Sequence, residues 1–290
     1  MYPSALDYRA PADLGEALVL LREHGDEAKV LAGGMSLVPL LKLRLATPSL
    51  VIDIGRIGGL NGIGRDDDAL RIGARTTHAE MEAAGLQPTC RILADAAPLI
   101  SDPLIRNMGT VGGSLCHADP QGDWGSVMLA LDAHCEVRST SGQRTVAVTD
   151  LLDGPFSTTL RPDEVMTSIR VPLPRGAASG TYLKLERKVG DFATVGVAVQ
   201  VELANGHIGK AGIGLTAVGG TNIKATEAEA FLAGKAPSDE VIAEAARLAA
   251  AAAQPRSDIR GSADYKRDVV RVFVQRGLRT AIGRALETRA

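Results

Sequence analysis

The first half of the chain alternates short apolar runs with helical patterns. After Asp13, a candidate N-cap, four apolar residues recur at the spacing of a helix, and His24-Gly25 predicts its end. Thr77 to Glu80 matches a capping box, which predicts a second helix start and a structural role for His78. Apolar runs bounded by turn residues predict strands at 29–32, 50–54, 70–74, 135–139, 145–148 and 165–171.

In the second half, strand patterns come first and helical patterns last. Every second residue from Val195 to Leu203 is apolar, which predicts a strand with one buried face. Asn205-Gly206 then predicts a type I′ hairpin turn, with the returning strand over 207–218. Helical patterns follow at 239–254 and 265–286. This order predicts a small α+β domain in which helices accompany an antiparallel sheet.

Two segments show no sustained hydrophobic period. Residues 172–180 are rich in Pro, Gly, Ala and Ser, which predicts a linker between a first domain over 1–175 and a second domain over 179–287. Residues 100–124 combine Gly, Asp, Asn, Ser and Pro inside a compact chain, which is typical of a functional loop.

The composition disfavours several classes of protein. The 290 residues include 45% apolar and 23% charged side chains, which is ordinary for a soluble globular protein of one large or two ordinary domains. A net charge of −2 argues against a nucleic-acid partner, which needs a basic face. The sequence shows neither a signal-peptide pattern nor a run of about 18 apolar residues, so we expect a cytoplasmic protein without a membrane span.

The cysteines and histidines form no metal-binding pattern. Cys90, Cys116 and Cys135 are widely spaced, and we interpret them as small buried hydrophobic residues. The five histidines show no H-E-x-x-H or similar spacing. We therefore expect this chain to bind no metal of its own.

Two glycine-rich segments carry the strongest chemical signal. The first glycine segment, Ala32-Gly33-Gly34-Met35-Ser36, follows an apolar strand, and the second is Thr110-Val111-Gly112-Gly113-Ser114. Successive glycines let backbone N–H groups point into one concavity that binds anionic oxygens, and the hydroxyls add donors. Either segment alone is also explained as a tight turn. The presence of both favours a diphosphate held from two sides.

Other nucleotide and catalytic motifs are absent or incomplete. Gly62-Ile63-Gly64 follows no clear strand, and Gly212-Ile213-Gly214 lies inside an alternating strand, so neither matches the dinucleotide fingerprint G-x-G-x-x-G. Neither the P-loop pattern nor the G-x-S-x-G nucleophile pattern occurs. The sequence therefore disfavours nicotinamide and nucleoside-triphosphate sites of those kinds, and a serine nucleophile of that type.

The glycine segments and two later stretches resemble a known family. Residues 32–36 with the Leu40–Arg44 run look like the first FAD motif of the flavin-binding medium subunit of the molybdenum hydroxylases (xanthine oxidase family). Aerobic carbon monoxide dehydrogenases are the most similar members. Residues 106–123 (RNMGTVGGSLCHADPQGD) resemble the second motif, and 184–192 and 262–270 match the C-terminal domain in character. The resemblance covers essentially the whole chain. It implies an α+β fold, with a two-subdomain PCMH-type FAD-binding domain followed by the small α+β domain.

The resemblance also assigns residues to a non-covalently bound FAD. Residues Lys29 to Leu37 would wrap the pyrophosphate and ribityl chain, with the N–H groups of Gly33, Gly34 and Ser36 as donors. The second segment would hold the diphosphate and the adenosine side. The full set implied in this way is Lys29, Val30, Leu31, Ala32, Gly33, Gly34, Met35, Ser36, Leu37, Ile100, Thr110, Gly113, Ser114, His117, Ala118, Asp123, Ile169, Lys184, Asp191 and Phe192.

Some of these positions have more specific implied roles. His117 and Asp123 would lie beside the ribityl chain or the ring, and Ile169 would pack against the flavin. Lys184 and Asp191 would reach in from the second domain. Phe192 would lie against the isoalloxazine, where relatives often carry tyrosine. Met35 also departs from the family, because glutamine or histidine is usual there.

Taken from the residues alone, other interpretations stay open at three positions. His117 is also explained as a structural or solvated histidine. Asp123 is also explained as the cap of a helix that follows Gly122. Phe192 is also explained as an aromatic residue of the core.

The resemblance further implies a multi-subunit oxidoreductase. An iron–sulfur cluster takes four thiolates, which three cysteines cannot supply. The [2Fe-2S] clusters and the molybdenum cofactor would therefore lie on a small and a large partner subunit, in a dimer of heterotrimers. FAD on this chain would collect electrons from the clusters and pass them to a quinone or another acceptor. Peripheral attachment at the inner face of the cell membrane is an alternative to a free cytoplasmic location.

Three other functions stay open at this point. The first is the FAD subunit of an N-heterocycle dehydrogenase of the nicotine, quinoline or xanthine type. The second is a stand-alone FAD oxidase, for which His117 is the only conceivable acid or base. The third is a nucleotide-binding module that is not an enzyme.

Overall fold

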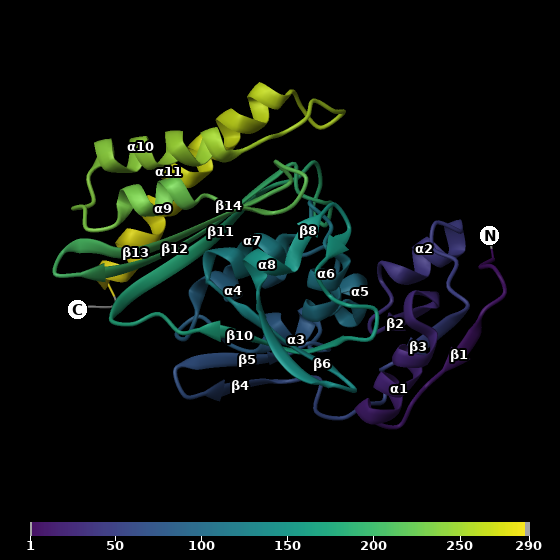
Figure 1. Cartoon of the computed structure of the whole chain (residues 1–290). Coiled ribbons are helices and arrows are strands. Elements are labelled where there is room, and N and C mark those ends of the chain that lie inside the picture. Colours follow the sequence, from purple (N-terminus) through teal and green to yellow (C-terminus); the bar gives the residue numbers. More distant parts are fainter. Residues whose placement is uncertain (1, 288–290) are drawn as a thin grey trace.

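Three sheets of three or more strands organise residues 2–287, the part of the chain that the computed structural model describes (Figure 1). The first sheet is parallel, in the order β1-β3-β2, with β1 (Asp7–Arg9), β2 (Ala28–Leu31) and β3 (Leu50–Asp53). The connecting helices are α1 (Leu14–His24), η1 (Gly25–Glu27) and α2 (Leu37–Leu43). The predicted strands at 29–32 and 50–54 are confirmed. In a parallel sheet the loops after the strands gather at one edge, where ligands commonly bind.

Local signals explain the two ends of α1. Asp13 is the N-cap, and its side chain accepts a hydrogen bond from the N–H of Glu16 at 2.9 Å. Gly25 is the C-cap, with a φ of 52° that glycine adopts at little cost. Ala17, Leu18 and Leu21 form the buried face. The predicted helix is therefore confirmed at both ends.

The second sheet is antiparallel, in the order β4-β5-β10-β6-β7. Its strands are β4 (Ile63–Asp66), β5 (Ala69–Gly73), β6 (His134–Ser139), β7 (Gly142–Ala147) and β10 (Val165–Pro172). The four predicted strands of this region are confirmed, with small shifts at their ends. After β7 come α8 (Val148–Leu151) and a small separate sheet of β8 (Leu152–Gly154) and β9 (Ser157–Thr158).

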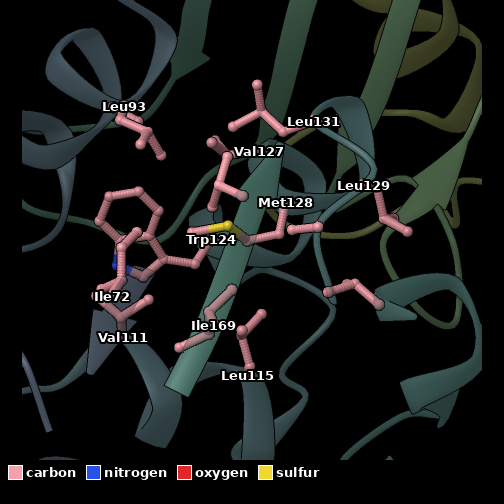
Figure 2. Close-up of a cluster of buried hydrophobic side chains, with 14 of the residues drawn as sticks. Ile72, Leu93, Val111, Leu115, Trp124, Val127, Met128, Leu129, Leu131 and Ile169 are labelled. Atoms are coloured by element: carbon pink, nitrogen blue, oxygen red, sulfur yellow. The ribbon is translucent and has the colours of Figure 1, made fainter. Parts of the chain in front are cut away.

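The helices between β5 and β6 build a core on the second sheet. They are α3 (His78–Ala83), α4 (Arg91–Ala96), η2 (Ala97–Leu99), α5 (Pro103–Met108), α6 (Val111–His117) and α7 (Asp123–Ala130). Figure 2 shows Trp124 and Met128 of α7 near Leu115 of α6 and Ile169 of β10. All four side chains are fully buried. This core fixes α6 and α7 firmly.

The expected loop over 100–124 is wrong as a description of the backbone, because this stretch folds into α5, α6 and the start of α7. Two of these helices begin at side-chain caps. Asp102 accepts from the N–H of Ile105 at 3.0 Å, and Thr110 accepts from the N–H of Gly113 at 3.1 Å. Helices of six to eight residues are too short to show a helical period.

The third sheet is antiparallel, in the order β11-β12-β13-β14. Its strands are β11 (Ala177–Leu185), β12 (Val195–Ala204), β13 (His207–Thr216) and β14 (Ile223–Lys224). Asn205 and Gly206 have φ values of 52° and 81°, as a type I′ turn requires, so the predicted hairpin is confirmed. The predicted linker over 172–180 is wrong in its second half. Residues 177–180 begin β11, where their small side chains allow close packing.

Helices cover both faces of the third sheet (Figure 1). On one face lie α9 (Thr226–Leu232), α10 (Asp239–Ala252) and α11 (Ala263–Glu287), of which the last two confirm the predicted helices. On the other face α4 and α7 pack against the strands. Gly212 and Gly214 allow α7 to lie close, because a Cβ at either position would overlap a carbonyl group of α7. This Gly-x-Gly pattern is therefore a packing feature.

The histidine and cysteine predictions are tested by burial. His78 is buried in the first turn of α3, behind the predicted capping box of Thr77 and Glu80, as expected. Cys90 and Cys135 are buried and Cys116 is half-buried, and burial raises the pKa of the Cys90 and Cys116 thiols to about 12. Within residues 2–287, no three His, Cys, Asp or Glu side chains gather as metal ligands would. No helix in this range is long and apolar enough to span a membrane.

Candidate functional site

The first glycine segment lies at the carboxyl end of β2, directly before α2. Gly34 has a φ of 76°, which turns the chain sharply between the strand and the helix. In the described part of the chain, no hydrogen bond has the N–H of Gly33, Gly34, Met35 or Ser36 as its donor. Successive N–H groups left open in this way are suited to an anionic ligand.

The second glycine segment lies against the first. A Cβ on Gly33 would overlap the carbonyl group of Met108 and would lie 3.1 Å from the Cα of Gly109. Glycine at position 33 therefore allows the backbone of the first segment to approach the residues directly before Thr110. The structure thus brings together the two segments that the sequence separates by more than 70 positions.

The second segment differs from the first in its hydrogen bonding. The N–H groups of Val111 and Gly112 donate to the carbonyls of Thr76 and Ala74, both at 2.9 Å. The N–H of Gly113 donates to Thr110 Oγ1 at 3.1 Å. A Cβ on Gly112 would lie 2.7 Å from the Ala74 carbonyl oxygen, so this glycine serves the contact between α6 and β5. The N–H groups of residues 111–114 are consequently used inside the protein, whereas no hydrogen bond in the described part of the chain has the Thr110 N–H as its donor.

His117 ends α6 beside an aromatic residue that the sequence analysis did not select. The ring centroids of His117 and Phe156 lie 5.1 Å apart, and His117 is half-buried. Ala118 follows with a φ of 50° and its carbonyl accepts from the N–H of Phe156 at 3.0 Å. Burial lowers the pKa of His117, with the charge of Asp119 acting in the opposite direction.

Asp123 is the first residue of α7 and is 7% exposed. Its Oδ1 accepts from the Tyr182 hydroxyl at 2.6 Å, and its Oδ2 accepts from Lys184 Nζ at 3.0 Å. Gly122 is the N-cap of α7, so the interpretation of Asp123 as that cap is wrong. Burial raises the pKa of Asp123, and the Lys184 charge opposes that rise.

Lys184 is therefore held at the junction of β11 and the helices of the second sheet. Its side chain is 2% exposed, and Nζ also donates to the carbonyl oxygen of Leu99 at 2.8 Å. The carboxylate of Glu186, directly after the end of β11, lies 3.6 Å from Nζ. Two carboxylates thus flank one buried ammonium group, and the predicted residue Ile100 lies directly after Leu99.

The loop after β11 carries Asp191 and Phe192. The Phe192 side chain is 52% exposed, so its interpretation as a core aromatic is wrong. Asp191 accepts from the backbone N–H of Phe192 at 2.8 Å and from Arg187 Nε at 3.1 Å. These two bonds lower the pKa of Asp191, the larger part coming from Arg187. Phe192 is therefore partly exposed on a loop that the Asp191 carboxylate holds in place.

The remaining selected residues fall into two groups. Ile169 is fully buried at the centre of β10 within the core of Figure 2, and it is not brought to the exposed part of the site. The strand and helix residues that flank the first glycine segment have exposed or half-buried side chains, and so does its first residue, Ala32; the flanking residues are Lys29, Val30, Leu31 and Leu37. Ser114 is half-buried on α6.

The residues present fit a cofactor that has both a diphosphate and polar ring edges. Four consecutive open N–H donors suit the diphosphate. Among the described residues, only Glu186 Oε2 and Arg260 Nε are buried side-chain polar atoms without a hydrogen bond, and both lie next to selected site residues. Buried polar atoms are normally paired, so these two orphans are concentrated where a ligand is expected.

Comparison with known proteins adds an independent line of observation. The model of the FAD binding domain in molybdopterin dehydrogenase matches residues 4–174, and the model of the CO dehydrogenase flavoprotein C-terminal domain matches residues 180–281. The carbon monoxide dehydrogenase medium chain of Hydrogenophaga pseudoflava is 39% identical over 98% of this chain and 99% of its own length.

Two further proteins are similar over nearly their whole length. The 6-hydroxypseudooxynicotine dehydrogenase complex subunit alpha of Paenarthrobacter nicotinovorans is 39% identical over 100% of this chain and 98% of its own. A solved structure of carbon monoxide dehydrogenase from H. pseudoflava superposes with a TM-score of 0.94 and 41% identity, covering 98% of this chain and 99% of the other. Sequence and fold therefore agree on one family.

Proposed function

The chain belongs to the family of FAD-binding subunits of molybdopterin dehydrogenases, and from this premise we propose that it is the electron-transfer flavoprotein of a carbon monoxide dehydrogenase-like complex. The open N–H donors of the first glycine segment carry the proposal within the structure. They provide a candidate anion site at the carboxyl end of a strand in a parallel sheet, where ligands commonly bind.

The residues of this chain would bind and orient FAD, which supplies two-electron redox chemistry when bound. The N–H groups of the first segment would hold the diphosphate, the Ser114 hydroxyl would add a donor from the second, and Thr110 would act there mainly as the cap of α6. The Asp123–Lys184 pair would line the ribityl side with fixed charges. Phe192 would cover the ring and limit contact with water. His117 would pack beside the ribityl chain, so no side chain here has to transfer a proton.

We assign the partners by the same premise. A small subunit with [2Fe-2S] clusters would deliver electrons, and a large subunit with the molybdenum cofactor would oxidise the substrate. The proposed assembly is a dimer of heterotrimers in the cytoplasm or at the inner face of the membrane, with a quinone or another acceptor. Support comes from the names of the relatives, which describe medium chains and subunits of dehydrogenase complexes.

A second candidate is the FAD subunit of an N-heterocycle dehydrogenase. The relative from P. nicotinovorans is as similar to this chain as the carbon monoxide dehydrogenase medium chain. Because the large subunit would bind the substrate, the two candidates predict the same site in this chain. Assays of carbon monoxide and of nicotine-type heterocycles with the purified complex distinguish them.

The proposal is tested by purifying the chain with its native partners. We expect a flavin absorbance spectrum with FAD released by denaturation, one smaller iron–sulfur partner and one larger partner. A chain that lacks flavin after reconstitution with FAD contradicts the cofactor assignment. A lone flavoprotein whose flavin a small substrate reduces directly supports the stand-alone oxidase instead.

A further inference from the structure

Arg260 joins two parts of the site that no sequence motif connects. It lies in the turn 258–261 between α10 and α11, and its side chain is 16% exposed. Nη1 donates to Gln121 Oε1 at 2.9 Å, and Nη2 donates to Asp191 Oδ1 at 3.1 Å. One guanidinium therefore bridges the turn before Asp123 and the loop that carries Phe192.

The turn that presents Arg260 is itself well fixed. Asp258 and Gly261 exchange two backbone hydrogen bonds of 3.1 Å, and the N–H of Arg260 donates to Asp258 Oδ1 at 2.8 Å. Lys266, only 3% exposed on α11, donates from Nζ to Asp258 Oδ2 at 2.7 Å. The guanidinium is thus presented by a rigid turn anchored to the longest helix.

The loop on the other side depends on the bridge. The Asp191 carboxylate accepts hydrogen bonds from Arg187, from the backbone N–H of Phe192 and from Arg260. Gly190, with a φ of 86°, lies against the backbone of Ser101, and this contact supports the loop. Arg187 is more than half exposed, whereas Arg260 is largely buried. Exposed ion pairs are screened by solvent, so Arg260 is the less screened of the two anchors, although Arg187 lowers the pKa of Asp191 more.

We propose that Arg260 is a positioning residue, which holds Phe192 in place through Asp191 and thereby limits the access of water to the bound flavin. The planar guanidinium suits this role because it reaches Gln121 and Asp191 at once, which an ammonium group cannot do with the same geometry. The order of the loop is a property of this chain alone, whereas the effect on flavin access rests on the proposed function.

The first test measures hydrogen exchange of residues 186–193 in the full chain without FAD. Arg260→Met should accelerate exchange of the Phe192 amide about tenfold to a hundredfold, the range expected when a hydrogen bond to a charged group is lost. Arg279→Met is the matched control, because Arg279 forms a 2.8 Å ion pair with Asp239 on the exposed helices. Unchanged exchange in Arg260→Met overturns the proposal. If that variant does not fold, Arg260→Lys, which keeps the charge and loses the bridge, decides with the same measurement.

A double-mutant comparison tests whether Arg260 acts through Asp191. Asp191→Asn and Arg260→Met should each accelerate exchange, and the double variant should exceed the larger single effect by less than about twofold. Multiplicative effects show that the two residues act independently and overturn the proposed route.

The second test loads the same variants with FAD and measures iodide quenching of flavin fluorescence. Arg260→Met should raise the quenching constant as much as Phe192→Ala does, and Arg279→Met should not. Quenching equal to wild type in a flavin-containing Arg260→Met chain overturns the positioning role. Absence of bound FAD in the wild type instead overturns the proposed function and leaves the exchange result standing.

Discussion

The two glycine segments look alike in sequence but use their backbones differently. In the first segment, the N–H groups of residues 33–36 donate to no acceptor in the described part of the chain. In the second, the N–H groups of residues 111–114 all donate to acceptors within the chain. The first segment therefore keeps its backbone donors open, and the second uses the donors of residues 111–114 to hold α6 in place. Two segments of similar composition therefore use their backbone N–H groups differently.

The glycines explain this division. Gly33 has no Cβ because the carbonyl group of Met108 occupies that space, and Gly112 has none because Ala74 does. Both glycines allow backbones to approach, whereas Gly34 supplies the positive φ that turns the chain into α2. We therefore propose that one donor loop, which lies against the end of α5, contributes most to the predicted diphosphate clamp.

The largest expected effect comes from breaking the contact between the segments. Gly33→Ala should abolish FAD retention and lower the free energy of unfolding by about 1–3 kcal/mol, the cost of overpacking, because the new Cβ displaces Met108. Gly64→Ala is the control, since a Cβ there meets nothing within 4 Å. Flavin content after gel filtration and urea denaturation measure the two effects. Full flavin content in Gly33→Ala would refute the donor-loop assignment.

A fall in pH should destabilise the fold beside the second segment, because it favours protonation of His78. The ring lies against Gly109, and its Nδ1 accepts from Trp124 Nε1–H at 3.0 Å, so Nδ1 carries no proton. Burial, with a smaller contribution from the charge of Arg106, lowers the pKa of His78 to about 4 from 6.5. Protonation is therefore easier in the unfolded chain, and this stabilisation, present above pH 6.5, is lost as the pH falls toward 4.

The acid effect has a defined size and control. The pKa difference corresponds to a decrease of about 3 kcal/mol in the free energy of unfolding between pH 7 and pH 4. Urea denaturation of wild type and His78→Gln across this range should give a smaller pH dependence for the variant, because glutamine accepts from Trp124 without titrating. Equal slopes in both proteins would remove His78 as the cause.

Removal of the helix cap should have a smaller effect. Thr110→Ala deletes the acceptor for the N–H of Gly113 and should lower the free energy of unfolding by about 1 kcal/mol. FAD affinity should fall only slightly, because the donor loop is untouched. Thr110→Ser keeps the cap and should behave like wild type in both thermal melting and FAD titration. A collapse of affinity in Thr110→Ala would mean that the hydroxyl binds the ligand directly.

Long elements of the fold were readable from the sequence, and short ones were not. The strand from Val195 shows its period over nearly its whole length, and the Asn205-Gly206 turn has one preferred geometry. In contrast, α5 has six residues and α6 has seven, two of them glycines. Their caps, Asp102 and Thr110, were the readable signals that the loop-like composition of the region obscured.

The contacts that complete the site could not be predicted from the sequence, because they join positions that are far apart in the chain. Arg260 meets Gln121 across 139 positions, and no local pattern reports such a pair. Tyr182 had a readable signal, since it precedes Lys184 by two residues and a strand places such residues on one face. The same face then delivers both donors to Asp123.

Substitution of Met35 should have the smallest effect of all, and it separates the role of a side chain from the role of the backbone in the donor loop. Met35 is the position at which the resemblance implies glutamine or histidine, and it is 38% exposed and carries no side-chain hydrogen-bond donor. Met35→Ala keeps every N–H group of the segment, so FAD affinity should change less than about threefold and stability by less than about 0.5 kcal/mol. Isothermal titration of the apo-chain with FAD measures the first quantity. If Met35→Ala loses FAD as completely as Gly33→Ala, the side chain and not the backbone defines the first segment, and the contrast between the two segments fails.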